Sequence, residues 1–321
     1  MKNVVLLEKE RSFGQVATGS CAGGVRYQFG TEINVGLSIE SLRMLVRFKD
    51  EIGQDINYRK CGYLFVLTNP KDVAIFKHST ELQHQLGVQT RWLNGEEVRS
   101  RLPLMKFDDA LAGTFNQDDG LVDPNSVVMG YIHAAQRLGV KIINNAEVIG
   151  IHVSRGKVTG VDTTQGPIET RLIPNAAGPW SAQIGQMAGI NIPIQPIRRQ
   201  IFTTTPLLDV PFDQSVDKKF ELINLEAAIQ RMPLLEKAER SAHWAGLYEV
   251  TPDAHPTFGY APLEGFLVLT GFSGHGFIHD PIAGKLISEL ILDGKFTTID
   301  VSMLDLARFR EGKSIQEYNV V

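Results

Sequence analysis

A strand that leads directly into a glycine-rich turn and then a helix is the strongest chemical signal in this chain. Phe266–Thr270 is an apolar run, Gly271–Phe277 reads GFSGHGF, and apolar residues recur at helical spacing after Pro281. Backbone N–H groups at the start of such a helix point at what lies beyond them and favour an anion or an electron-rich group. The sequence therefore predicts a ligand site at this turn.

A second signal is Glu8, which ends the short apolar strand Val4–Lys9. In a dinucleotide-binding βαβ unit, a carboxylate at the end of the second strand accepts hydrogen bonds from ribose hydroxyls. The first strand and its glycine fingerprint, an opening of roughly 30 residues, are expected ahead of Met1 and are absent from the sequence. Glu8 predicts a dinucleotide site; the alternative is the solvated end of a strand.

Composition narrows the class of protein. The chain has 321 residues, 43% hydrophobic and 21% charged, which is enough for one large core or two intimately shared domains. A net charge of -4 and a pI near 6.1 argue against a nucleic-acid partner. No apolar run approaches the ~20 residues of a membrane helix, and the opening is too short for a signal peptide. The only cysteines, Cys21 and Cys61, predict neither a disulfide nor a metal site, so a reducing cytoplasmic compartment is expected.

Local patterns predict the elements that hold these residues. Helices are expected at 38–52, 72–86, 96–102, 124–139 (with Asp123 as N-cap), 212–239 and from 282 onward. Strands are expected at 63–67, 148–151, 158–161, 170–173 and 266–270, with little strand before the helix at Phe212.

Four stretches, in this order, carry a resemblance to a known family: 6–9 with 17–26; 175–181 (NAAGPWS); 246–248 through 251–253 (GLY…TPD); and 271–277. The chain resembles FAD-dependent oxidoreductases of the D-amino-acid oxidase superfamily. It is most similar to sarcosine oxidase β-subunits, dye-linked proline dehydrogenase subunits and mitochondrial FAD-dependent oxidoreductase-domain proteins. Each stretch alone is weak evidence for the family. Four stretches with the family's order and separation are strong evidence.

The resemblance implies cofactor-binding roles for residues in all parts of the chain. Those residues are Glu8 at the adenosine ribose; Thr18, Gly19 and Ser20 along the pyrophosphate and isoalloxazine; Gly23 and Gly24 in the flavin loop, otherwise a plain turn; Val148 at the adenine; Ala177, Gly178 and Trp180 in a flavin wall; and Gly274, His275, Gly276 and Phe277 at the flavin pyrimidine edge.

Three residues are catalytic candidates, each with an alternative. Arg26 could pair with a substrate carboxylate or be a surface arginine. Tyr248 could take part in the chemistry or only in packing, and His275 could move a proton or be a neutral, backbone-bonded histidine. The pair Arg198-Arg199 is expected at a strand edge with one solvated face; substrate contact is the other possibility.

The implied fold is α/β. An incomplete FAD-binding Rossmann-like domain comprises 1–49, 122–191 and 246–321, and an antiparallel-sheet substrate domain comprises 50–121 and 192–245. Family members have further strands in the region that only residues 205–219 span here. An internal deletion is therefore expected. Non-covalent FAD is implied, because Gly246 stands where covalent members carry cysteine. Without the fingerprint, weak FAD affinity is expected.

The implied activity is oxidation of the C–N bond of a secondary amine or amino acid (sarcosine-, proline- or glycine-like) by hydride transfer to flavin. A protein partner subunit is possible, and the mitochondrial matrix is the expected place in a eukaryote. Two other interpretations stay open at this point: a non-catalytic or truncated paralogue that acts as a binding or assembly protein, and an incomplete gene model of an active enzyme.

Overall fold

The computed structural model describes residues 3–204, 218–237 and 240–318. The helices are α1 (Glu32–Val46), α2 (Phe48–Ile52), α3 (Pro70–Gln85), α4 (Gly95–Arg101), α5 (Pro124–Arg137), α6 (Ser181–Met187), α7 (Lys218–Arg231), α8 (Gly276–Asp293) and α9 (Arg308–Glu311), with 3-10 turns η1 (Gly178–Trp180), η2 (Pro233–Lys237) and η3 (Ser302–Leu304). None of the described helices is both long enough and apolar enough to cross a membrane.

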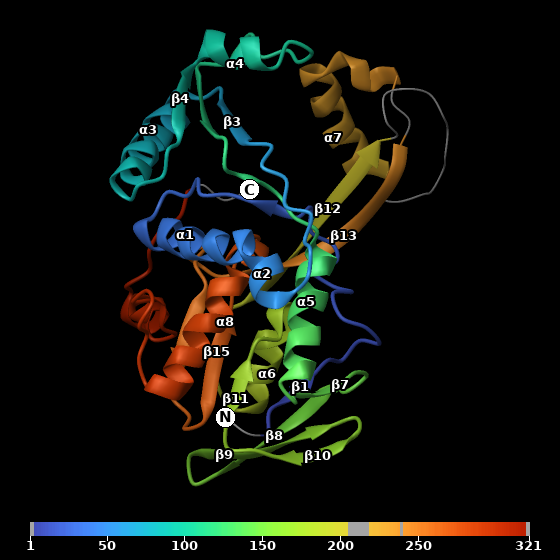
Figure 1. Ribbon diagram of the computed structural model, residues 1–321, viewed down its shortest axis with the longest axis vertical. Coiled ribbons are helices and arrows are strands. Elements are labelled where there is room, and N and C mark those ends of the chain that lie inside the picture. The colour runs from blue at the N-terminus through green and yellow to red at the C-terminus, as the bar shows by residue number, and fades with distance from the viewer. Residues whose placement is uncertain (1–2, 205–217, 238–239, 319–321) are drawn as a thin grey trace.

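Short strands form several small sheets. They are β1 (Val5–Leu7), β2 (Gly24–Val25), β3 (Tyr63–Leu67), β4 (Arg91–Asn94), β5 (Ala112–Asn116), β6 (Gly120–Leu121), β7 (Lys141–Ile143), β8 (Val148–Ser154), β9 (Lys157–Thr163), β10 (Gly166–Glu169), β11 (Ile173–Asn175), β12 (Gln195–Thr204), β13 (Arg240–Val250), β14 (Thr257–Tyr260) and β15 (Phe266–Thr270). Figure 1 shows β8, β9 and β10 at one end, α3, α4 and β4 at the other, and the ribbon of β12 and β13 rising between them.

Two parallel strand pairs form the centre of the Rossmann-like part. β1 pairs with β7, and β11 pairs with β15, which also pairs antiparallel with β14. Ile33 and Leu37 of α1 pack with Ile282 and Leu286 of α8, and with Leu267 of β15. Parallel strands need long crossover connections, and α5 immediately before β7 supplies the last part of one. The predicted α/β class is confirmed.

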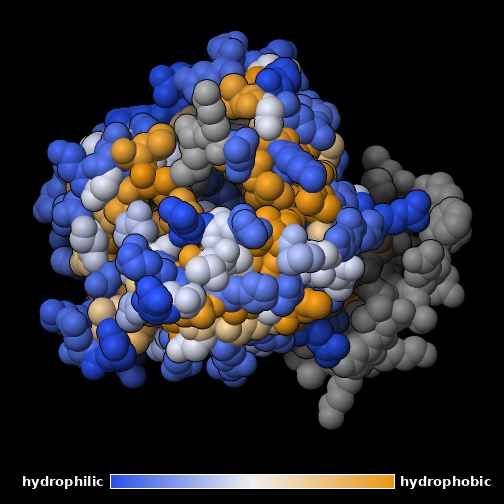
Figure 2. Space-filling view, turned by 90° about the horizontal axis from the view of Figure 1, so that it is seen from below, coloured by the Kyte–Doolittle hydropathy of each residue, from blue (hydrophilic) through white to orange (hydrophobic). Residues whose placement is uncertain are grey.

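β1 is unusually exposed for a parallel strand. Val4, Val5 and Leu6 are 39%, 37% and 40% exposed, and within the described residues β1 pairs only with β7. Strands of parallel sheets are normally buried on both faces. Figure 2, seen from the end of the molecule where β8 to β10 lie, shows hydrophobic residues gathered around a hollow. The apolar residues at this strand are therefore only partly covered by the described residues.

The antiparallel part contains the sheet β3-β5-β4, beside which α3 packs. The prediction of a strand at 63–67 is confirmed in full, and the predicted helices at 72–86 and 96–102 are α3 and α4 with ends displaced by one or two residues. α4 begins with a capping box, because the Asn94 side chain accepts from the Glu97 N–H and the Glu97 carboxylate accepts from the Asn94 N–H.

Local capping signals were reliable at α5. The Asp123 side chain accepts hydrogen bonds from Asn125 N (3.1 Å) and Ser126 Oγ (2.6 Å), and Pro124 is the first helical residue.

Tertiary packing changed the prediction for the helix at 38–52. The expected helix at 38–52 divides at Arg47, and the division lets Phe48 pack edge-on against Tyr131 of α5 (4.9 Å between ring centroids).

Four other predictions needed correction. β12 is ten residues long, so the expectation of little strand before Phe212 is wrong; β12 forms because it pairs with β13 along its whole length. The expected helix at 212–239 contains α7 and η2, while 212–217 and 238–239 lie outside the described residues. α8 begins at Gly276, earlier than predicted, and continues through Pro281. The strand expected at 170–173 lies at β11 instead.

Candidate active site

Glu8 lies where β1 ends, as predicted. Its backbone N donates to Ile143 O (2.9 Å), and its carbonyl oxygen accepts from Ala146 N (2.9 Å), so the pairing with β7 extends past the strand. Its Oε1 accepts from Glu10 N (2.9 Å), and Oε2 has no hydrogen bond to any described residue. Val148, which starts β8, is two residues beyond Ala146. The predicted ribose and adenine residues are therefore neighbours.

Trp180, at the end of η1, lies beside the same strand end. Lys9 Nζ lies 3.5 Å from the centroid of the Trp180 ring. Within η1, Gly178 has φ +52°, and its carbonyl oxygen accepts from Thr270 Oγ1 (3.3 Å) at the end of β15. The predicted wall Ala177–Trp180 thus connects the end of β1 with the end of β15.

The loop before β2 is closely packed around its glycines. A Cβ on Gly19 would lie 1.8 Å from Gly14 O, and a Cβ on Gly23, which has φ +73°, would lie 2.1 Å from Val122 O. Ser20 O accepts a hydrogen bond from Trp244 Nε1 (2.9 Å), so this loop contacts β13. Neither position has room for a side chain. Glycine at both positions therefore lets the loop backbone approach Gly14 and Val122 closely.

The turn before α8 has the backbone conformation that its glycines suggested. Ser273 has φ +53° and Gly274 has φ +98°. A Cβ on Gly274 would lie 2.3 Å from Tyr248 Cε2, so the Tyr248 ring packs directly on the backbone of the turn. The 18-residue helix α8 starts at Gly276, with its N-terminal N–H groups beside this turn. The sequence prediction of a strand, turn and helix is confirmed here.

Glu249, which the sequence reasoning missed, connects the wall Ala177–Trp180 with the turn before α8. Its Oε2 accepts from Thr270 Oγ1 (3.0 Å), and its Oε1 accepts from Phe272 N (3.3 Å). A Cβ on Gly178 would lie 3.1 Å from Glu249 Oε2. Burial raises the pKa of Glu249, although the hydrogen bonds from Phe272 and Thr270 lower it. The sequence could have suggested Glu249, because it directly follows Tyr248 of the GLY stretch.

His275 is fully packed by aromatic rings. Its ring centroid lies 5.2 Å from that of Phe29 and 5.3 Å from that of His279, and the residue is 3% exposed. Burial, followed by the nearby His279 and Arg26, lowers the pKa of His275 well below its usual value. The geometry favours the neutral histidine over a proton-transfer role, which stays a prediction.

Arg26 lies in an aromatic cage instead of at the surface. Its Cζ is 4.5 Å from the Phe29 ring centroid, 5.0 Å from that of Phe65 and 5.7 Å from that of Tyr63, and the residue is 4% exposed. Burial lowers the pKa of its guanidinium, while Tyr63 and then Asp119 and Glu317 oppose that effect. The alternative of a surface arginine is therefore wrong, and contact of Arg26 with a substrate carboxylate stays a prediction.

Asp280 is a carboxyl group in the first part of α8. The surrounding protein raises its pKa to about 7, with Glu249 adding to the effect. Burial also raises the pKa of Cys21, and Asp280 contributes to that shift, which places the thiol near Asp280. Asp280 is four residues after Gly276 on α8, a spacing that could have suggested it.

Asp119 is a second buried acid and gives a testable pH dependence. It is 0% exposed and accepts from Tyr27 N (2.7 Å) and Gln28 Nε2 (2.8 Å). Burial raises its pKa to about 7, against the opposing effect of Gln28, Tyr27 and Arg26. An unfolded aspartate has a pKa of about 3.9, so between about pH 4 and 7 only the folded state keeps the proton. This group therefore makes the folded state less stable as the pH rises through that window.

We expect Asp119→Asn to remove this contribution. Urea unfolding of the unmodified protein and of the variant should differ in pH dependence between pH 4.5 and 7.5 by about 3 kcal/mol, the size of a shift of this order. Asp118→Asn is the matched control, because Asp118 is exposed and pairs with Lys60 at the surface. Equal pH dependence in the unmodified protein and Asp119→Asn would show that Asp119 is ionised throughout.

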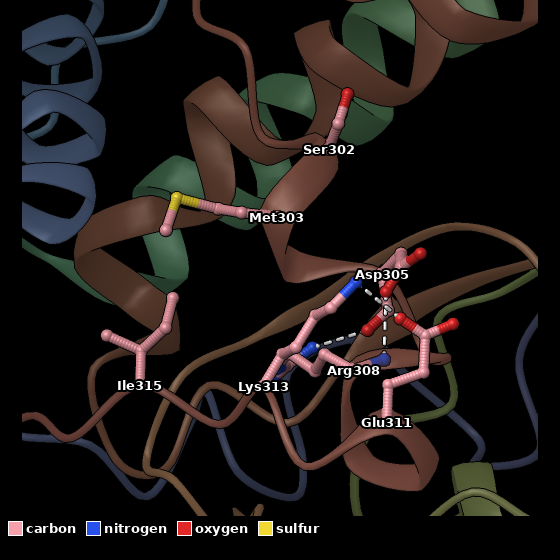
Figure 3. A pocket seen from close by; sticks show the side chains of 7 residues that line it. All are labelled: Ser302, Met303, Asp305, Arg308, Glu311, Lys313 and Ile315. Carbon is pink, nitrogen blue, oxygen red and sulfur yellow. Dashed lines mark hydrogen bonds and ion pairs between the residues drawn. The ribbon is translucent and has the colours of Figure 1, made fainter.

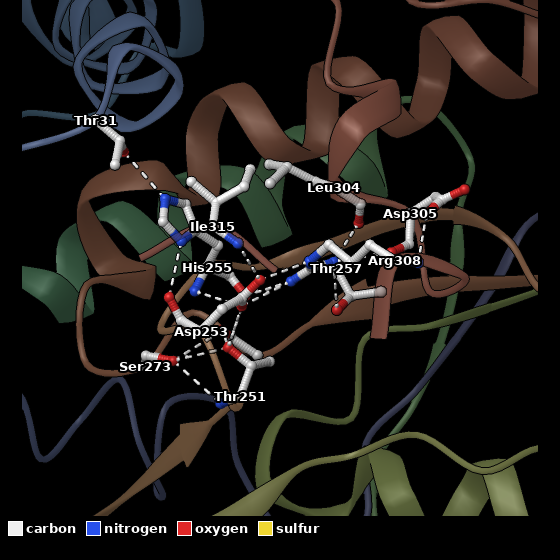
Figure 4. Close-up of polar contacts among 11 residues, drawn as sticks. Thr31, Thr251, Asp253, His255, Thr257, Ser273, Leu304, Asp305, Arg308 and Ile315 are labelled. Carbon is white, nitrogen blue, oxygen red and sulfur yellow. Dashed lines mark hydrogen bonds and ion pairs between the residues drawn. The ribbon is translucent and has the colours of Figure 1, made fainter. Parts of the chain in front are cut away.

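A buried polar network fastens the C-terminal segment beneath the turn (Figure 4). Arg308 Nε donates to Asp253 Oδ2 (2.8 Å), and both side chains are 1% exposed. Thr251 N donates to Ser273 Oγ (3.2 Å), so the network reaches the turn itself. Glu317 accepts from Gly30 N (2.8 Å) beside the start of α1. The segment therefore supports both ends of the site.

A cavity of about 330 Å³ lies next to this network (Figure 3). It is lined by Ser302, Met303, Asp305, Arg308, Glu311, Lys313 and Ile315. Lys313 Nζ pairs with Glu311 Oε2 at 2.7 Å. None of these residues belongs to the predicted site, so the cavity is separate from it.

The chain matches the model of a known family along most of its length. The family is described as "FAD dependent oxidoreductase" (DAO), and it matches residues 1–222 and 209–290. Among curated proteins, FAD-dependent oxidoreductase domain-containing protein 1 of Xenopus laevis is 25% identical over 395 aligned positions, covering 99% of this chain and 79% of that protein. Mitochondrial dimethylglycine dehydrogenase of Rattus norvegicus is 25% identical, covering 98% of this chain and 43% of that protein.

Solved structures agree with this result. L-Proline dehydrogenase from P. horikoshii superposes with a TM-score of 0.88 and 26% identity, covering 98% of this chain and 99% of that chain. Glycine oxidase from Geobacillus kaustophilus, at 22% identity and a TM-score of 0.81 over 95% and 92% of the two chains, has the same fold. The resemblance predicted from four short motifs is confirmed. This chain belongs to the DAO family of FAD-dependent oxidoreductases, and its cofactor is FAD.

Proposed function

We propose that this oxidoreductase oxidises the C–N bond of a small secondary amine or amino acid, of the sarcosine, proline or glycine type. The proposal rests on the contacts of two neighbouring residues of β13. Tyr248 packs on the turn at Gly274, while Glu249 lies against Gly178 and accepts a hydrogen bond from Phe272 N. The relatives support it, since they include proteins named for dimethylglycine, sarcosine and proline. FAD supplies the hydride acceptor for the carbon next to nitrogen, and water then hydrolyses the imine.

The residues present fit the cofactor. Glu8 has a carboxylate oxygen without a hydrogen bond among the described residues, as a ribose ligand requires. A Cβ on Gly274 would collide with the Tyr248 ring at 2.3 Å, and one on Gly178 would lie 3.1 Å from Glu249 Oε2, so glycine lets the backbone come close to these side chains. The N-terminus of α8 would place N–H groups at the flavin edge, where they stabilise negative charge. Thr18, Gly19 and Ser20 would follow the pyrophosphate and isoalloxazine.

The chain's own residues would prepare the site for reaction. The raised pKa of Asp280 keeps much of this acid protonated near neutral pH, so there is less negative charge beside the N-terminus of α8. The Tyr248 ring packs on the turn at Gly274 and would hold its backbone in place. A neutral amine must reach the site, and its alignment over the flavin would be the main contribution of the protein.

The test is flavin content followed by anaerobic reduction. The protein is mixed with FAD, separated from free cofactor, and its visible flavin absorbance is measured. Sarcosine, proline and glycine are then added without oxygen, with lactate as a control that lacks nitrogen. Bleaching by at least one amine, with none by lactate, is expected. Stable FAD binding without bleaching by any of these amines would contradict amine oxidation and favour a binding or assembly role.

Three further parts of the prediction belong to this proposal. The division into an FAD-binding domain (1–49, 122–191, 246–321) and a substrate domain (50–121, 192–245) stays a prediction, and the pairs β2-β6 and β12-β13 cross its boundaries. A place in the mitochondrial matrix, if the source is a eukaryote, is supported by the mitochondrial names of several relatives, and a cytoplasmic place stays a prediction. A partner subunit stays a prediction, which size-exclusion chromatography with light scattering of an affinity-purified sample would test.

A further inference from the structure

Glu317, near the C-terminus, is a buried carboxylate at the start of α1. It is 1% exposed, although glutamate is rarely buried unless it is paired. Its Oε1 accepts a hydrogen bond from Gly30 N (2.8 Å), and its Oε2 accepts from Thr31 Oγ1 (3.0 Å) and Asn34 Nδ2 (2.9 Å). The two ends of the chain are therefore joined at the first turn of α1.

Glu317 supplies the negative group that the start of α1 does not find locally. Thr31 is the N-cap residue of α1, yet its side chain makes no capping hydrogen bond. An acceptor or a negative charge at this position stabilises a helix. The Thr31 hydroxyl instead donates to Glu317 and lies 3.0 Å from His255 Nε2 (Figure 4). The start of α1 is thus fixed by the C-terminal segment.

The segment that carries Glu317 is itself anchored. Lys313 N donates to Arg308 O (2.9 Å), and Ile315 N donates to Asp253 Oδ2 (3.4 Å). Arg308 and Asp253 form the buried ion pair described above. Glu317 is therefore held in place by backbone contacts on its own side as well as by α1.

The residues just before Gly30 connect this contact with the turn before α8. Phe29 is completely buried, and its ring centroid lies 5.2 Å from that of His275, the N-cap residue of α8. Arg26 Cζ lies 4.5 Å from the centroid of the same Phe29 ring. We call Arg26, Phe29 and His275 the stack. Because protein interiors are close-packed, a shift of Gly30 would pass through Phe29 to His275.

Glu317 also contributes charge to the stack. Burial is the largest effect on the pKa of Arg26 and lowers it, and Glu317 is one of the groups that oppose this shift. A buried guanidinium is costly without negative charge nearby. The same carboxylate therefore acts on the stack through backbone geometry at Gly30 and through its charge at Arg26.

We propose that Glu317 is a positioning residue for the FAD site, because it holds the stack, and through His275 the turn before α8, in the arrangement that receives the flavin. The inference rests on the predicted place of the flavin edge beside this turn. It does not depend on which substrate is oxidised, so it and the proposed oxidation of a C–N bond can fail separately.

The first test needs no cofactor. Hydrogen–deuterium exchange of the FAD-free protein should be at least tenfold faster in Glu317→Ala, both in peptides covering 26–34 and in peptides covering 270–278, because charge-assisted hydrogen bonds are lost. Glu311→Gln is the matched control, since it neutralises an exposed acid of the same segment, and neither region should change. Faster exchange confined to 26–34 would show that the stack does not transmit the effect, and would overturn the proposal.

The second test measures FAD binding. Glu317→Ala should weaken the affinity about tenfold, as loss of one such hydrogen bond implies. Glu317→Gln should restore part of it, because the amide keeps the shape without the charge. Asn34 Oδ1, which has no hydrogen bond to a described residue, can turn to accept from that amide. At saturating FAD, the visible circular dichroism of the flavin should differ between Glu317→Ala and the unmodified protein, whereas a residue that only stabilised the fold would leave it unchanged. Affinity and spectrum equal to those of Glu311→Gln would refute the role of Glu317.

A double-mutant cycle tests the route. Phe29→Leu removes the ring that links Arg26 and His275 while keeping an apolar side chain in the core, with circular dichroism in the far ultraviolet as the folding control. If Glu317 acts through the stack, Glu317→Ala should weaken FAD binding much less in the Phe29→Leu background than alone. Fully additive effects would mean that Glu317 acts on the site by another route, and the proposal would be withdrawn.

Discussion

Gly274→Ala is expected to lower FAD affinity at least tenfold while leaving most of the fold in place. The residue has φ +98°, and a Cβ would lie 2.3 Å from Tyr248 Cε2 and 2.6 Å from Cδ2. The strained backbone costs about 1–3 kcal/mol, and the collision costs about 1–3 kcal/mol more. The turn, Tyr248 or both must move, and both face the proposed flavin position. Flavin titration of the purified variant measures the effect, with circular dichroism as the folding control.

Gly284→Ala is the matched control in the same helix. Its Cβ would meet nothing within 4 Å, so FAD affinity should be unchanged and the helix slightly more stable. Gly276→Ala should fall between the two, because its Cβ would lie 3.2 Å from Phe272 Cβ and its backbone needs no positive φ. Equal affinities for Gly274→Ala and Gly284→Ala would show that the turn at Gly274 does not hold the cofactor.

Arg308→Met is expected to destabilise the protein by about 3–5 kcal/mol, because it leaves Asp253 charged and buried without its partner. Arg308 Nη2 also donates to Asp253 Oδ1 (3.1 Å) and to His255 O (3.0 Å), and Nη1 donates to Leu304 O (2.7 Å). Replacing it therefore also leaves carbonyl oxygens unsatisfied (Figure 4). Urea unfolding followed by circular dichroism measures the change.

The effect should depend on pH. Burial alone would raise the pKa of Asp253, but the hydrogen bonds and charge of Arg308 outweigh it and lower the pKa. An aspartate with a depressed pKa stabilises the folded state above its unfolded pKa of about 3.9, and this contribution disappears as the pH falls through the folded pKa. The penalty of Arg308→Met should accordingly shrink in acid.

Lys313→Met tests whether any loss of charge in this segment has the same consequence. Lys313 and Glu311 form an exposed pair, with side chains 73% and 51% exposed, so removing the lysine should leave the stability almost unchanged. A loss for Arg308→Met no larger than for Lys313→Met would mean that the buried network is not a source of stability.

The sequence by itself determined the features that depend on a few consecutive residues. Asp123-Pro124 starts α5 because an N-cap acceptor and a fixed proline φ act locally. The strand at 266–270, the glycine turn and α8 follow one another in the chain, so their order was visible. Four short motifs were also enough to identify the family, because each one reflects a backbone path close to a cofactor.

Only the tertiary structure decided which residues face one another across the site. β12 and β13 are more than thirty residues apart in the chain, and their register alone places Arg199 beside Tyr248 and turns Arg198 away. Arg26 became a caged cation because β3 brings Tyr63 and Phe65 against it. Asp119 and Asp280 acquired raised pKa values because segments distant in sequence remove water from around their carboxyl groups. Burial and facing geometry depend on long-range packing, which no local pattern records.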